Sequence, residues 1–75
     1  MNYEQAKAII KSEAPELIIG LPHSDHIAVK KTNGSVPFCI TLPSMARVME
    51  GASAEDIYNA ELAAFTDAVQ AYKSK

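Results

Sequence analysis

The sequence predicts a single α+β domain: an N-terminal helix, a three-stranded antiparallel β-meander, and then a short and a long C-terminal helix packed on one face of the sheet. Three observations predict it. A capped helical pattern opens the chain, two alternating segments flank an Asn-Gly pair, and helical apolar periodicity fills the last third. Because 75 residues suffice for one hydrophobic core, residues 1–75 are expected to form one domain.

The first helix is predicted from Tyr3 to about Glu13. Asn2 is a favourable N-cap, and Gln5 stands three residues later, where a capping box needs it. Apolar residues follow at helical spacing, namely Tyr3, Ala6, Ile9 and Ile10. Pro15 disfavours helical geometry at the preceding residue and so ends the helix.

The three strands are predicted at 16–21, 26–31 and 36–42. Residues 22–25 have the composition of a turn. Asn33-Gly34 suits a two-residue type I′ turn, because both residues tolerate positive φ. That turn places Val29 opposite Phe38 and Ile27 opposite Ile40.

This register gives the sheet one apolar face. It carries Ile27, Val29, Val36, Phe38, Ile40 and Leu42. In the first strand, alternation puts Leu17, Ile19 and Leu21 on one side, and Ile18 and Gly20 on the other. Pro37 has no N–H, so its strand is expected at an edge of the sheet, or with the donor side of Pro37 facing solvent.

Two helices are predicted after the sheet. Ser44 would cap a short helix from Met45 to Glu50, with Gly51 at its end. Ser53 would cap a long helix from Ala54 to about Tyr72, with Asp56 at the third helical position. The stripe of the long helix is Tyr58, Leu62, Phe65, Val69 and Tyr72, flanked by alanines.

Charge and composition exclude several classes of protein. Seven Lys and Arg residues stand against nine Asp and Glu, so the formal net charge is −2, which disfavours direct nucleic-acid binding. No apolar run approaches 18 residues, so no membrane span is predicted. Cys39 is the single cysteine, which excludes an internal disulfide and favours a cytoplasmic location.

One cluster has residue types suited to a metal or to acid–base chemistry. His23, Asp25 and His26 lie within four residues, and the predicted register brings Cys39 to the same face as His26. A small metal-binding protein or enzyme is therefore one alternative. A polar turn is the favoured interpretation, because such short matches are common. We accordingly expect no catalytic residue, no bound metal and no cofactor.

The segment from Met45 to Phe65 has the outline of a helix-turn-helix, which makes a DNA-binding regulator a second alternative. Acidic residues at the start of the long helix disfavour it, because Glu55 and Asp56 would face phosphate.

The favoured hypothesis is a non-catalytic protein-binding module, a small regulator or inhibitor that acts through its surface. Small acidic αβ proteins without disulfides are frequent among phage- and mobile-element-encoded inhibitors of host machinery, including anti-CRISPR proteins, although no motif here identifies such a family. The residues expected to meet a basic partner protein are Glu50, Glu55, Asp56, Glu61 and Asp67, with Met45 and Met49 as adaptable apolar contacts. The alanines of the long helix would let a second copy of the chain approach closely, so a homodimer is also an alternative.

Overall fold

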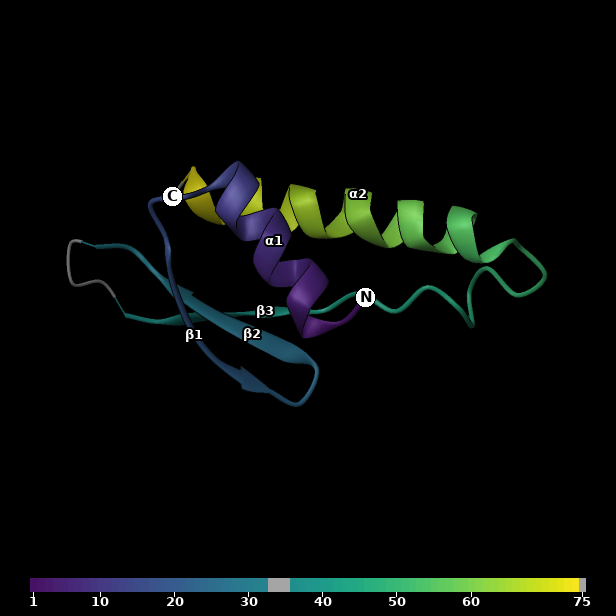
Figure 1. The fold of residues 1–75 in the computed structure, drawn as a ribbon, viewed down its shortest axis with the longest axis horizontal. Coiled ribbons are helices and arrows are strands. Elements are labelled where there is room, and N and C mark those ends of the chain that lie inside the picture. Colours follow the sequence, from purple (N-terminus) through teal and green to yellow (C-terminus); the bar gives the residue numbers. More distant parts are fainter. Residues whose placement is uncertain (33–35, 75) are drawn as a thin grey trace.

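The computed structural model describes residues 1–32 and 36–74, and it confirms the α+β class (Figure 1). The elements in chain order are α1 (Tyr3–Glu13), β1 (Ile18–His23), β2 (His26–Lys30), β3 (Phe38–Thr41) and α2 (Ala54–Lys73). The three strands form one antiparallel sheet in the order β1-β2-β3.

Helix α1 begins and ends where the sequence predicts. The Asn2 side chain accepts a hydrogen bond from the Gln5 N–H at 2.8 Å, and the Gln5 side chain accepts one from the Asn2 N–H at 2.9 Å. This reciprocal capping box satisfies two N–H groups that an uncapped helix would leave without partners. Pro15 follows Ala14, the C-cap residue.

The predicted pairing of the second and third strands is confirmed. Ile27 lies opposite Ile40, and Val29 lies opposite Phe38. β3 is an edge strand, as Pro37 predicts. The Asn33-Gly34 turn lies outside the described residues. Val36, expected on the apolar face, precedes the observed β3 and is exposed.

The first strand differs from its prediction, since β1 runs from Ile18 to His23 and includes residues assigned to a turn. The turn is shorter, with Ser24 at a φ of 50° between the paired residues His23 and His26. The register shifts between Ile19 and Pro22, which is a β-bulge. The extra residue breaks the alternation, and Leu21, predicted on the core side, is 83% exposed.

The prediction of a short helix from Met45 to Glu50 is wrong. Residues 46–51 form turns, with one helix-like hydrogen bond from the Met49 N–H to the Met45 carbonyl at 2.8 Å. Forming a single helical turn is unfavourable, because it restricts several backbone dihedral angles and gains only one hydrogen bond. No buried side chain in this segment offsets that loss. Gly51 has a φ of 95° and reverses the chain toward α2.

Helix α2 begins at the predicted cap, because the Ser53 hydroxyl accepts a hydrogen bond from the Asp56 N–H at 3.1 Å. It ends at Lys73, one residue beyond the expectation. Only the second half of its predicted stripe is buried, comprising Phe65, Val69 and Tyr72.

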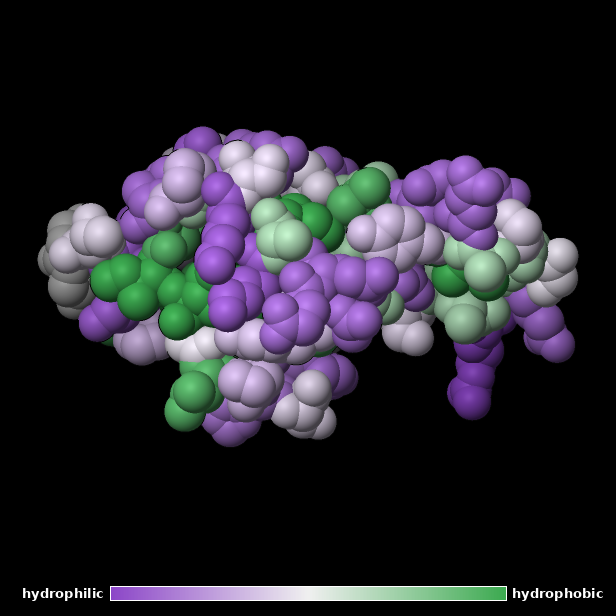
Figure 2. Space-filling model, viewed as in Figure 1, coloured by the Kyte–Doolittle hydropathy of each residue, from purple (hydrophilic) through white to green (hydrophobic). Residues whose placement is uncertain are grey.

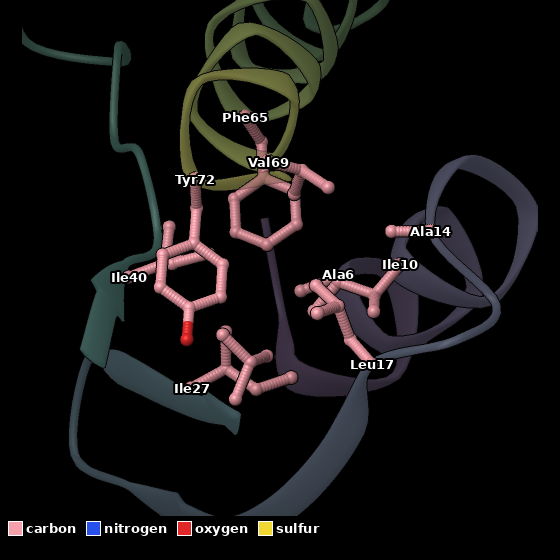
Figure 3. Close-up of a cluster of buried hydrophobic side chains, with 10 residues drawn as sticks. Ala6, Ile10, Ala14, Leu17, Ile27, Ile40, Phe65, Val69 and Tyr72 are labelled. Carbon is pink, nitrogen blue, oxygen red and sulfur yellow. The ribbon is translucent and has the colours of Figure 1, made fainter. Parts of the chain in front are cut away.

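One core joins both helices to the sheet (Figure 3). Its buried apolar residues are Ala6, Ile10, Ala14, Leu17, Ile27, Val29, Ile40, Phe65, Val69 and Tyr72. At its border the rings of Phe38 and Tyr72 stack with centroids 5.1 Å apart. Lys31 places its ammonium 5.6 Å from the Tyr72 centroid.

The molecule is elongated, with principal extents of 44 × 22 × 17 Å. The first half of α2 and the segment before it project beyond the sheet in Figure 1. We call residues 42–53, which precede α2, the arm. No residue of the arm is buried, and its hydrogen bonds include those from the Met49 N–H to the Met45 carbonyl and from the Ala52 N–H to the Met49 carbonyl.

The core predicts the effect of truncating its largest fully buried side chain. Phe65→Ala should lower the free energy of unfolding by about 3–5 kcal/mol, because it removes a ring that is 1% exposed. Phe65→Leu, which leaves a smaller void, should cost about 1.5 kcal/mol or less. Urea denaturation measures both.

The matched control is Leu21→Ala, which should change stability by less than about 0.5 kcal/mol. A loss below about 1 kcal/mol for Phe65→Ala would place this ring outside the core.

Candidate protein-binding groove

A groove runs along the surface between α1 and α2, with a volume of about 570 Å³. It is lined by Asn2, Glu4, Gln5, Ala8, Ile9, Ser12, Glu13, Tyr58, Leu62 and Thr66. Every lining residue belongs to one of the two helices or to the cap of α1. The helices therefore form the core with their inner faces and the groove with an adjoining face.

Two of the α1 side chains that line the groove are short and leave space above the helix. Ala8 and Ser12 are one helical turn apart and therefore neighbours on the same face. On α2, Tyr58, Leu62 and Thr66 succeed each other at four-residue spacing and form the opposite wall. None of these three is fully buried, so their apolar parts face open space in the groove.

The charges along the groove have one sign. Within the described part of the chain, the lining holds two carboxylates, Glu4 and Glu13, and no Lys or Arg. Glu55 precedes Tyr58 by three residues and Leu62 by seven, so it extends the acidic edge toward the arm.

The two ends of the groove differ. The Glu13 carboxylate accepts a hydrogen bond from the Gln70 amide at 3.2 Å. Lys73 donates to the Glu13 carbonyl at 3.0 Å and lies 3.9 Å from the Glu16 carboxylate. Cationic charge therefore stands near the Glu13 end, and Lys7 follows Glu4 by three residues on α1 at the other end.

The sequence did not predict this groove. Tyr58 and Leu62 were assigned to the core-facing stripe, but the core ends at Phe65. The available signal was the pair of short side chains, Ala8 and Ser12, at helical spacing on the first helix. It becomes meaningful only once the crossing of the two helices is known.

The seven residues predicted to meet a partner do not form one surface. Asp56 and Asp67 are eleven residues apart, about three turns, so they share one exposed face of α2. Asp67 follows Tyr58 by nine residues, about two and a half turns, which turns that face away from the groove. Glu55 lies on the groove side.

Three further predicted residues, Met45, Met49 and Glu50, lie in the arm. Glu50 is exposed, and the two methionines are half-buried. Their neighbour Val48 is 78% exposed, so the arm presents apolar surface to solvent. Figure 2 shows hydrophobic residues gathered at this end of the molecule, bordered by hydrophilic ones.

Glu61, also predicted at the surface, is buried with an exposed fraction of 6%. Its carboxylate accepts a hydrogen bond from the Met1 ammonium at 2.6 Å and another from the Met45 N–H at 3.0 Å. The ammonium first, and then the Met45 N–H, hold the pKa of the Glu61 carboxyl below its ordinary value despite burial. This carboxylate is therefore engaged within the chain, where it joins the start of α1 and the base of the arm to α2.

The His/Asp cluster is a polar turn at the end of the β1–β2 hairpin. His23 and His26 are cross-strand partners, and the Asp25 carboxylate lies 2.8 Å from His26 Nδ1. Cys39 is exposed on β3. Among the described residues, no three His, Cys, Asp or Glu side chains are grouped so that they could hold a metal ion.

The helix-turn-helix outline lacks its first helix, because residues 46–51 form turns. This removes the feature on which the DNA-binding alternative depended. In the part of the chain that the structure describes, no helix has the length and apolar character needed to cross a membrane.

Comparisons of this chain with protein-family models, with curated proteins and with solved structures found no match.

The buried carboxylate makes stability depend on pH. Glu61→Gln should lower the free energy of unfolding at neutral pH by about 1–3 kcal/mol, because the amide keeps an acceptor but loses the charge opposite the ammonium. The folded pKa lies below the ordinary value of 4.5, so the stabilisation is complete above that value. It is lost as the pH falls through the folded pKa.

Urea denaturation of both proteins at neutral pH and in acid measures this difference. The difference in the free energy of unfolding between wild type and Glu61→Gln should shrink in acid. The exposed control Glu50→Gln should have the same free energy of unfolding as wild type at both pH values. A gap that persists unchanged in acid would contradict the assigned role of Glu61.

Proposed function

We propose that this protein is a non-catalytic binding module, a small regulator or inhibitor, that takes a segment of another protein into the groove between α1 and α2. The observation that carries this proposal is the groove itself. Tyr58 and Leu62 continue the apolar face of α2 beyond the core, Ile9 packs at the edge of the core, and all three line the groove and are only half-buried. Apolar surface left uncovered beside a core is typical of an interaction site.

The shape supports a macromolecular partner. The groove is open along the surface, whereas small-molecule sites bury most of the ligand. A segment of a second protein can lie along both helices and cover the apolar wall. The arm, with its exposed Val48, stands next to the groove and would add contacts outside it.

The identity of the partner is a separate hypothesis. The size and acidic character of the chain are compatible with a phage- or mobile-element-encoded inhibitor of host machinery, such as an anti-CRISPR protein. A second copy of this chain is another form that the partner can take. Both hypotheses are tested by what is found in the groove.

Site-specific photocrosslinking tests the proposal. A benzophenone amino acid at Ser12, on the groove wall, should crosslink to a specific protein in cells. The same group at Thr41, exposed on the sheet, should not. A homodimer would instead give a product of twice the chain mass from the purified protein.

Two matched substitutions make the result specific. Ala8→Tyr fills the groove and should reduce the Ser12 crosslink about tenfold, which corresponds to a loss of about 1.4 kcal/mol in binding. Ala64→Tyr places the same ring on an exposed face of α2 and should leave the crosslink intact. Equal products at Ser12 and Thr41, or no effect of Ala8→Tyr, would overturn the proposal.

A further inference from the structure

The amine at Met1 is part of the fold, so its chemical state affects the structure. The Met1 nitrogen lies 2.6 Å from Glu61 Oε1, and the hydrogen bond between them is partly buried. The Met1 residue packs against the core, and Glu61 is buried. Neither residue lines the groove, so the chemistry of this pair is separate from the proposed function.

Three parts of the chain meet at the Glu61 carboxylate. Glu61 belongs to α2, and its Oε2 accepts a hydrogen bond from the Met45 N–H at the base of the arm. Its Oε1 accepts one from the Met1 amine, and the next residue, Asn2, is the N-cap of α1. A change at the Met1 nitrogen therefore acts on the start of α1, on α2 and on the arm together.

An acyl group on this nitrogen would remove its charge. A formyl or acetyl group turns the ammonium into an amide, which keeps one N–H and carries no positive charge. In the described part of the chain, no other cation is paired with Glu61. Its carboxylate would then be buried without a counter-charge, which is unfavourable. Water reaches the carboxylate only if Met1 or the base of the arm moves away from it.

We propose that the Met1 nitrogen is a modification site at which an acyl group controls the stability of this fold. A formyl or acetyl group there weakens the contact among α1, α2 and the arm, and the free ammonium restores it. Removal of a formyl group is a hydrolysis: water breaks the bond between the carbonyl carbon and the nitrogen, formate leaves, and the amine takes up a proton. The resulting ammonium is the donor that Glu61 accepts.

Full-length chains made by chemical synthesis test this proposal. The single cysteine, Cys39, is a ligation site near the middle of the chain, so the Met1 nitrogen can be left free, acetylated or methylated. In urea denaturation at neutral pH, acetylation should lower the folding equilibrium constant at least about tenfold, which corresponds to about 1.4 kcal/mol. Methylation adds bulk but keeps the positive charge and two N–H donors, so it should lower that constant less than about threefold.

The same three forms of Glu61→Gln show whether the effect acts through the carboxylate. Acetylation should lower the folding constant of this variant less than about threefold, because no buried charge loses its partner. Hydrogen exchange of the Met45 N–H is a second measurement that needs no substitution. In the wild-type sequence it should become at least about tenfold faster on acetylation, and less than about threefold faster on methylation.

The controls separate charge from bulk. Equal losses of stability on acetylation and methylation would assign the effect to bulk and overturn the proposal. An acetylation loss of the same size in wild type and in Glu61→Gln would overturn it as well, as would unchanged stability of the acetylated wild-type chain. An acetylated chain that fails to fold without urea, beside a methylated chain that folds, would support the proposal with a larger effect than expected.

Discussion

The rest of the structure depends on one small core to which both helices and the sheet contribute buried side chains. Ala6 and Ile10 from α1 meet Phe65 and Val69 from α2 above the buried residues of β2 and β3. Each helix uses one stripe for this purpose. Because the buried stripe of α2 begins only at Phe65, apolar side chains of its first half, such as Leu62, lie outside the core and are half-buried. The groove is thus a consequence of how the helices are anchored.

A buried ion pair sets the position of the remaining elements. Glu61 is the one charged residue that is buried in the described part of the chain, and both its carboxylate oxygens accept hydrogen bonds. Removing charges from water is costly, so such a pair persists only where the geometry satisfies it. Here it joins the start of α1 and Met45 to the middle of α2. It fixes the base of the arm and closes one end of the helix pair, while the arm beyond remains exposed to solvent.

Most of the fold could be predicted because its signals are local. The Asn2 and Ser53 caps bound both helices, and the pairing of Ile27 with Ile40 follows from the turn and the alternation together. The errors arose where the local pattern does not decide. The burial of Glu61 depends on the Met1 ammonium and the Met45 N–H, which are distant in the chain. The bulge that turns Leu21 outward depends on how β1 pairs with β2, and the helix expected after Met45 has no buried side chain to stabilise it. The groove was missed for the same reason, since helical periodicity does not specify where one helix crosses another.

The central claim is that the helix pair keeps an apolar groove open to solvent. The enhancement of methyl relaxation by a soluble paramagnetic probe, measured by NMR, tests it most directly. Ile9 and Ile10 are neighbours in the sequence, but the structure places them in different environments. Ile9 lines the groove, and Ile10 is fully buried in the core. The structure predicts strong enhancement at the methyls of Ile9 and Leu62, and protection at those of Ile10 and Val69. Equal protection of Ile9 and Ile10 would mean that the groove is closed in solution and would contradict the account.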